Sequence, residues 1–258
     1  MPTPKKCYKN IDFLSSLDAR PIRILCEYEE PAQRFRRYGV EDTIVLFGSA
    51  RTLPGDVAKE RHAAALESGD AAEIAAAERS LRSSVFYDQA RELSRRITEW
   101  SMNDVEHRNY YICTGGGPGI MEAGNRGASD VPGGLSVGLG ISLPFEEKVN
   151  RYVPEELAFE FHYFFTRKYW FMYFAKALIV FPGGFGTLDE FAELLTLIQT
   201  QKIKKAMPII LFGSEYWNTV INIPAMVEWG TISESDLELF RVIDTVDEAF
   251  DYLTGNLQ

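Results

Sequence analysis

The sequence predicts an α/β fold: a Rossmann-like, doubly wound and mainly parallel sheet of about seven strands, with helices on both faces. Short apolar runs, typical of strands buried on both faces, alternate with longer segments of helical sequence. Glycine-rich turns join two of these runs to the helices that follow them, as in βαβ units with right-handed crossovers. No linker interrupts the pattern, so residues 1–258 are expected to form a single domain.

Local patterning predicts each element in turn. The expected strands are residues 43–48, 110–113, 135–143, 159–165, 176–181, 207–212 and 241–244. The expected helices between them are residues 84–100, 118–129, 167–175 and 188–201. Residues 1–40 are expected to form short helical pieces interrupted at Pro31, as an extension packed on the domain. Residues 56–82, rich in Ala, Glu and Arg, are expected to be a helical insertion broken near Gly69.

Composition excludes several classes of function. The chain has 27 Lys and Arg against 37 Asp and Glu, a net charge of −10, which disfavours nucleic-acid polymers and anionic membranes as partners. Cys7, Cys26 and Cys113 form no CxxC pair, and the three histidines lack ligand spacing. We therefore expect neither a disulfide framework nor a metal site, and no cofactor. The N-terminus lacks the apolar run of a signal peptide, and no segment approaches the roughly 20 apolar residues of a membrane span, so a cytoplasmic protein is expected.

Two glycine-rich turns follow predicted strands. The first contains Gly115, Gly116 and Gly117, and the second spans residues 182–187. Glycines at the start of a helix let a phosphate oxygen approach free backbone N–H groups at the positive end of the helix dipole. A third turn, after residues 43–48, could add the hydroxyl of Ser49 and a cation. Alternatively, the glycines simply make tight turns, but two such turns in one sheet favour phosphate binding.

The type of phosphate compound is constrained by motifs that are absent. Neither turn contains the GxGxxG pattern of dinucleotide-binding proteins, and no acidic residue ends the next strand to hold a ribose diol. The GxxxxGK[ST] pattern of nucleoside triphosphatases is absent as well. The sequence therefore favours a single monophosphate group as the ligand.

Two short motifs near the second turn have alternative interpretations. Thr187 and Glu190 fit a capping box at a helix N-terminus, or Glu190 faces a ligand beside the phosphate cradle. Arg167 and Lys168 are either an exposed cationic pair or part of the same ligand-binding edge, because they follow a predicted strand. The aromatic residues around them form either a core helix or a subunit interface: Tyr169, Trp170, Phe171, Tyr173 and Phe174.

Residues 182–190, PGGFGTLDE, resemble the PGGxGTxxE signature of the LOG family, the cytokinin riboside 5′-monophosphate phosphoribohydrolases, formerly called "lysine decarboxylase-like". The Arg167-Lys168 pair and residues 114–128 are also similar to that family. The resemblance covers about residues 43–212. It implies a Rossmann-like sheet, a homodimer or larger homo-oligomer, and hydrolysis of a nucleoside 5′-monophosphate to free base and ribose 5-phosphate.

The resemblance also implies roles for individual residues. The family's catalytic arginine and glutamate match Arg167 and Glu190, and the lysine of its RK pair matches Lys168. A further substrate-contacting glutamate matches Glu146, although the surrounding loop differs. The implied nucleotide-binding residues are Gly183, Gly184, Phe185, Gly186, Thr187, Leu188 and Asp189. Residues 1–40 and 56–82 are extra to the short plant members and resemble longer bacterial ones, so AMP or another purine monophosphate is the expected substrate.

Two other functions remain as alternatives. Pyridoxal-dependent lysine decarboxylation requires a Schiff-base lysine in a suitable pocket, a setting that neither Lys168 nor Lys176 has in the sequence. A non-catalytic carrier or binding protein for a phosphorylated cofactor, such as the molybdenum cofactor, would need the same glycine-rich cradle. Release of free adenine from AMP would distinguish the hydrolase from the carrier.

Overall fold

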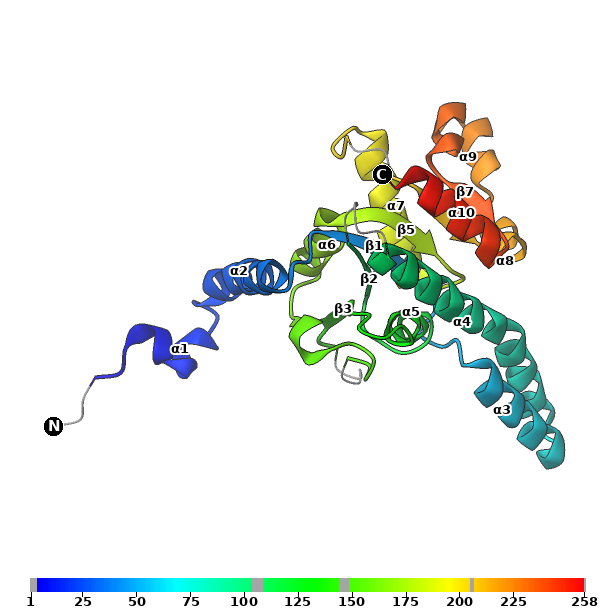
Figure 1. Ribbon diagram of the computed structural model, residues 1–258, viewed down its shortest axis with the longest axis horizontal. Coiled ribbons are helices and arrows are strands. Elements are labelled where there is room, and N and C mark those ends of the chain that lie inside the picture. Colours follow the sequence, from blue (N-terminus) through cyan, green and yellow to red (C-terminus); the bar gives the residue numbers. More distant parts are fainter. Residues whose placement is uncertain (1–3, 104–108, 144–148, 205–206, 258) are drawn as a thin grey trace.

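Figure 1 shows the computed structural model of the chain, which describes residues 4–103, 109–143, 149–204 and 207–257. Within these residues, seven parallel strands form one sheet in the order β4-β3-β2-β1-β5-β6-β7. The predicted α/β class is confirmed, and the sheet is entirely parallel. The strands are β1 (Asp42–Phe47), β2 (Tyr110–Thr114), β3 (Ser136–Ile141), β4 (Ala158–Phe161), β5 (Ala175–Val180), β6 (Ile209–Phe212) and β7 (Arg241–Ile243).

Helices connect the strands and cover the sheet. They are α1 (Ile11–Leu14), α2 (Arg20–Tyr38), α3 (Gly55–Ser68), α4 (Ala71–Asn103), α5 (Ile120–Ser129), α6 (Phe164–Tyr173), α7 (Phe185–Gln199), α8 (Ser214–Val220), α9 (Ile223–Glu228) and α10 (Val246–Asn256). Short 3₁₀ helices occupy Cys7–Lys9, Glu155–Leu157 and Glu234–Leu239. Among the helices of the described residues, none has the length and apolar character needed to cross a membrane.

Alternation along β1 explains why both faces of the sheet are covered. Ile44 and Leu46 point to one face, where they belong to a core cluster with residues of α4, α5 and α10. Val45 and Phe47 point to the other face, where they belong to a cluster with residues of α2, α6, α7 and α8. Because successive side chains of a strand point to opposite faces, an uninterrupted apolar run requires helices on both sides.

The strand order reverses at β1. The chain adds β2, β3 and β4 on one side of β1, then returns to place β5 against its other edge. In open α/β sheets, such a reversal leaves a crevice at the carboxyl ends of the two central strands. The turns after β1 and β5 meet there, where the backbone N–H of Ser49 donates to the carbonyl oxygen of Pro182 at 2.9 Å. This edge is therefore the expected place for a ligand.

The N-terminal region contains one continuous helix where the sequence predicted a break. Pro31 lies inside α2, and its ring nitrogen cannot donate to the carbonyl oxygen of Glu27 one turn earlier. The indole Nε1 of Trp170, in α6, donates to that oxygen at 2.8 Å instead. The predicted interruption at Pro31 is wrong because a partner from another helix satisfies the carbonyl that proline leaves unpaired.

The segment after β1 forms a helical hairpin. Gly69, with φ of +71°, caps the C-terminus of α3 in a left-handed conformation. The predicted break near this residue is confirmed. No break occurs at residue 82, since α4 runs without interruption over 33 residues. Its second half packs Tyr87, Leu93 and Ile97 on the sheet, while α3 lies along its first half, beyond the sheet (Figure 1).

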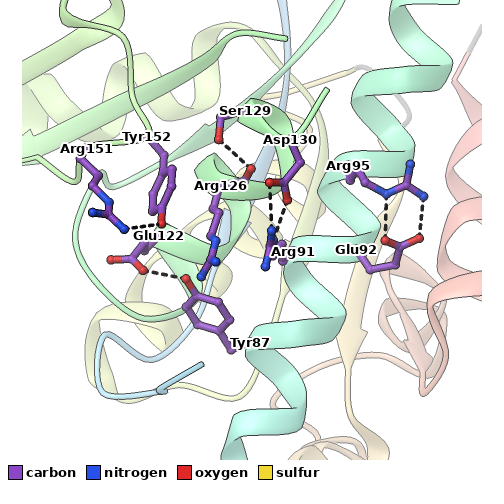
Figure 2. Close-up of polar contacts among 10 residues, drawn as sticks. All are labelled: Tyr87, Arg91, Glu92, Arg95, Glu122, Arg126, Ser129, Asp130, Arg151 and Tyr152. Carbon is purple, nitrogen blue, oxygen red and sulfur yellow. Dashed lines mark hydrogen bonds and ion pairs between the residues drawn. The ribbon is translucent and has the colours of Figure 1, made fainter. Parts of the chain in front are cut away.

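Polar contacts tie the long helix α4 to α5, as Figure 2 shows. The hydroxyl of Tyr87 donates to Glu122 at 2.6 Å, and burial together with this bond raises the pKa of Tyr87. One turn further along, Arg91 makes two hydrogen bonds with the carboxylate of Asp130, at 2.6 and 2.9 Å. These contacts hold α5 in place, and α5 begins directly after the first glycine-rich turn.

Candidate functional site

The first glycine-rich turn, after β2, is held by hydrogen bonds from within the protein. The N–H of Gly116 donates to the hydroxyl oxygen of Thr114 at 2.9 Å, and the N–H of Ile120 donates to the carbonyl oxygen of Ser49 at 3.1 Å. The amide of Asn150 donates to the carbonyl oxygens of Gly116 and Gly117 at 3.0 and 3.1 Å. Two N–H groups that a phosphate could have used are therefore already engaged.

Gly115 in this turn makes room for Arg167. A Cβ atom placed on Gly115 would lie 2.5 Å from the Nη2 atom of Arg167, closer than two such atoms can approach. The Nε of Arg167 donates to the carbonyl oxygen of Leu139 at 2.6 Å, and the guanidinium lies 5.0 Å from the ring centre of Phe171. The absence of a side chain at Gly115 thus permits the guanidinium to sit against the turn.

The second turn, after β5, leads into α7 earlier than predicted. Helix α7 begins at Phe185 with Gly184 as its N-cap, which provides no capping side chain. Thr187 and Glu190 consequently lie inside the helix, and the capping-box interpretation is wrong. The first N–H groups of a helix have no intrahelical partner, so this end presents backbone donors and the positive end of a dipole.

The second turn is packed against the protein at Gly183 and is exposed at Gly184 and Gly186. The hydroxyl of Tyr216 donates to the carbonyl oxygen of Gly183 at 2.6 Å. A Cβ atom on Gly183 would lie 2.2 Å from the hydroxyl of Thr187, so only glycine fits there. Gly184 and Gly186 are exposed, and Cβ atoms on them would meet nothing within 4 Å. The space beside these two glycines is therefore accessible to a ligand.

Glu190 is a buried carboxyl group in the first half of α7. It is only 4% exposed, and its Oε2 atom has no hydrogen-bond partner within the described part of the chain. Burial raises the pKa of Glu190 to about 7, although Lys168 and Arg167 act in the opposite direction. A buried carboxyl group that titrates near neutral pH is a common feature of active sites. The neighbouring Asp189 is 56% exposed, so the two carboxylates face different surroundings.

Lys168 connects α6 to α7. Its ammonium group lies 2.7 Å from a carboxylate oxygen of Asp189 and 2.8 Å from one of Glu193, which is one turn further along α7. Burial acts to lower the pKa of Lys168, but hydrogen bonds to these two carboxylates raise it overall. The side chain therefore fixes the spacing between the helix that carries Arg167 and the helix that carries Glu190.

The structure brings most of the predicted site residues to one edge of the sheet. Arg167 and Glu190 are close enough for their charges to interact, and Gly115 touches the arginine. Phe185 is 92% exposed at the mouth of the second turn, while Leu188 packs against the core. Glu146 lies outside the described residues.

Three residues beside the second turn were not predicted as site residues. Arg79 and Arg82 of α4 and Tyr216 of α8 line a cleft of about 520 Å³ together with Ser49, Gly183 and Gly184. The two arginines are three residues apart on a helix, a spacing that places side chains on one face, but the sequence does not reveal which strand end that face approaches.

A metal site is not apparent among these groups. Within the described ranges, no set of three or more His, Cys, Asp or Glu side chains is arranged to hold an ion. The potential ligand-binding groups are instead backbone donors, arginines and one buried carboxyl.

The fold and these turns define a doubly wound α/β protein with an exposed, glycine-rich helix N-terminus at its strand switch point. A family model described as "Possible lysine decarboxylase" matches residues 121–253, just over half of the chain. The chain belongs to this family, the LOG family, as the PGGFGTLDE motif predicted. No curated protein matches the chain at a significant level.

Proposed function

We propose that this protein hydrolyses the N-glycosidic bond of a nucleoside 5′-monophosphate, AMP or a cytokinin riboside monophosphate, to free base and ribose 5-phosphate. The observation that carries the proposal is the placement of Glu190. A buried carboxyl group, one oxygen of which has no hydrogen-bond partner among the described residues, follows an exposed, glycine-rich helix N-terminus by about one and a half turns. Family membership supports a nucleotide-processing enzyme.

The N-terminus of α7 would hold the 5′-phosphate. Gly184 and Gly186 are exposed, with open space where side chains would be, and the helix dipole favours a dianion there. Binding energy from the phosphate would place the ribose over the next part of the helix, so that its anomeric carbon comes near Glu190. The phosphate group thus serves to orient the bond that breaks.

Glu190 would act on the ribose. Cleavage of the bond between C1′ and the base nitrogen develops positive charge on the sugar, which a nearby carboxylate stabilises. Water adds to C1′, one of its protons is lost, and the base leaves with the bonding electrons and takes up a proton. A carboxyl group with a pKa of about 7 can accept the proton from water at neutral pH.

Arg167 would position the nucleotide and Glu190. Its guanidinium is held by Leu139 and supported by Phe171, and it acts to lower the pKa of Glu190. An arginine keeps its charge in proteins, so it is poorly suited to protonate the leaving base. Its contribution is therefore electrostatic and geometric.

Lysine decarboxylation is not supported by the lysines of this site. A Schiff base with a cofactor aldehyde requires a neutral amine. Lys168 is paired with two carboxylates, and Lys176 lies 3.1 Å from a carboxylate oxygen of Asp42. The pairing of Lys168 raises its pKa and favours the charged ammonium form, which does not react with an aldehyde.

The test is release of adenine from AMP by the purified protein. Glu190→Gln should lower kcat by about 10²- to 10³-fold, because the charge that stabilises the sugar cation is lost. Glu67→Gln, at an exposed position on α3, removes a charge of the same kind and should leave kcat unchanged. Wild-type rates in Glu190→Gln would refute the role of Glu190. Tight AMP binding without adenine release would favour the carrier instead.

We also propose that the protein is a homodimer or larger homo-oligomer. Trp170 and Phe171 of α6 are buried in the core, but four aromatic side chains around them are 40–56% exposed: Phe164, Phe165, Tyr169 and Tyr173. Large exposed aromatic groups gathered on one helix are typical of a surface that another chain covers. Light scattering of the purified protein would test this, and a monomer at micromolar concentration would contradict it.

A further inference from the structure

A cleft with three arginines lies beside the N-terminus of α7. It has a volume of about 520 Å³, and Pro182, Gly183 and Gly184 form one of its walls. Arg51, from the turn after β1, and Arg79 and Arg82, from α4, line the same cleft. This volume is within the usual range for small-molecule sites and exceeds what a single phosphate group fills.

One stripe of α4 faces this cleft. Arg79, Arg82, Ser83 and Phe86 all line it, and their spacing of three, four and seven residues places them on one side of a helix. The opposite wall comes from α8, where Tyr216 also bonds to the carbonyl oxygen of Gly183. The first half of α4 thus reaches the edge of the sheet where the second glycine-rich turn lies.

The arginines of the cleft are not paired with carboxylates of the described residues. Within the described part of the chain, Arg51, Arg79 and Arg82 form no ion pair, and Glu215 is the one carboxylate that lines the cleft with them. The chain as a whole carries a net charge of −10. Three cations gathered around one opening of an acidic protein create a local positive potential that favours an anion.

The position of the cleft relative to Glu190 indicates which part of a ligand would occupy it. Glu190 does not line the cleft, although Gly183 and Gly184 do. A nucleotide whose 5′-phosphate sits on the N-terminus of α7 and whose ribose extends toward Glu190 would direct any further phosphate away from the ribose. Because Gly183 and Gly184 line the cleft and Glu190 does not, the cleft is the adjoining space for such a group, and there Arg79 and Arg82 could each donate to phosphate oxygens.

We propose that this cleft binds a second phosphate group joined to the 5′-phosphate, so that the protein takes nucleoside 5′-diphosphates and inorganic pyrophosphate as ligands. The assignment rests on the proposed phosphate site at the N-terminus of α7. It gives the first half of α4, which is outside the family match at residues 121–253, a role in ligand selection.

Calorimetric titration with inorganic pyrophosphate and inorganic phosphate, at fixed ionic strength and without divalent cations, tests the proposal. Neither probe has a glycosidic bond, so binding is measured independently of hydrolysis. Wild-type protein should bind pyrophosphate at least about tenfold more tightly than phosphate, and ADP should likewise bind more tightly than AMP. In Arg79→Gln/Arg82→Gln, the pyrophosphate-to-phosphate ratio should fall to near one.

The control is Arg36→Gln/Arg61→Gln, which removes two exposed arginines that do not line the cleft. It should keep the wild-type ratio, and the circular dichroism of all variants should match. Equal affinity for pyrophosphate and phosphate, or a ratio that Arg79→Gln/Arg82→Gln leaves intact, would overturn the proposal. Adenine release from AMP with no preference for pyrophosphate would refute the proposed second phosphate site and leave the proposed hydrolase activity standing. A preference for pyrophosphate that depends on Arg79 and Arg82, without adenine release from AMP, would refute the proposed hydrolase activity and leave the second phosphate site standing.

Discussion

The carboxylate of Glu27, in α2, accepts a hydrogen bond from the hydroxyl of Thr166, in α6. It also accepts from the backbone N–H groups of His162 and Tyr163, at 2.8 and 3.3 Å. A residue of the N-terminal region therefore caps the helix that begins just before Arg167. This places α2 in the supporting structure of the proposed active site.

Glu27→Gln should loosen this end of α6. Loss of the charged acceptor weakens bonds to N–H groups at a helix N-terminus, and we expect a loss of about 1–2 kcal/mol in the free energy of unfolding. Because Arg167 lies in the first turn of α6, kcat for AMP should fall as well. Urea unfolding and adenine release measure the two effects. Glu29→Gln, an exposed neighbour, should change neither, and equal behaviour of the two variants would contradict the capping role.

Glu190 should make stability depend on pH. Its pKa of about 7 in the folded protein exceeds the ordinary value of 4.5, so the folded state holds the proton more tightly than the unfolded state. The contribution of this carboxyl group to the free energy of unfolding is therefore largest below about pH 4.5. It is lost as the pH rises through about 7, and the total loss is about 3 kcal/mol.

Glu190→Gln should remove that dependence. The free energy of unfolding of the variant, measured by urea titration, should exceed that of the wild type at pH 8 and approach it at pH 4.5. An equal difference at both pH values would show that the carboxyl group titrates normally. In the wild type, kcat should rise through about pH 7 as the catalytic carboxylate forms.

Lys168 should contribute to stability through Asp189. Each single variant, Lys168→Met or Asp189→Asn, weakens the connection between α6 and α7, and the double variant should lose less than the sum of the two. We expect a coupling of about 0.5–1 kcal/mol in the free energy of unfolding, since Asp189 is partly exposed. A rise in KM for AMP in Lys168→Met, without coupling to Asp189, would indicate that the lysine binds substrate instead.

Gly115→Ala should displace Arg167. The new methyl group would collide with the guanidinium, which is the flexible end of its side chain, so the fold should survive while the arginine moves. We expect kcat for AMP to fall by about 10- to 100-fold, the scale of a misplaced catalytic group. Gly255→Ala in α10, where the added methyl group meets nothing within 4 Å, is the matched control. Full activity in Gly115→Ala would argue against a requirement for Arg167 at this position.

The sequence correctly predicted those elements that depend on residues close together in the chain. The apolar run of β1 and the turn at Gly69 depend on neighbouring residues, and both appear where they were predicted. The prediction of a break at Pro31 was wrong, and of the two interpretations of Thr187 and Glu190 the capping box was wrong. At Pro31, Trp170 supplies the missing hydrogen bond from a helix about 140 residues away. At the second turn, α7 starts two residues before Thr187, so the threonine is a helical residue and not a cap.

The amino-acid sequence by itself determined the parallel α/β class, the two glycine-rich turns and the family motif, because apolar runs and glycines act on the chain within a few residues. Tertiary structure alone decided that Glu190 is buried with a raised pKa, that Gly115 admits the guanidinium of Arg167, and that Arg79 and Arg82 border the second turn. These properties arise from desolvation and contact between segments far apart in the chain, and such contacts exist only once the sheet has brought its strand ends together.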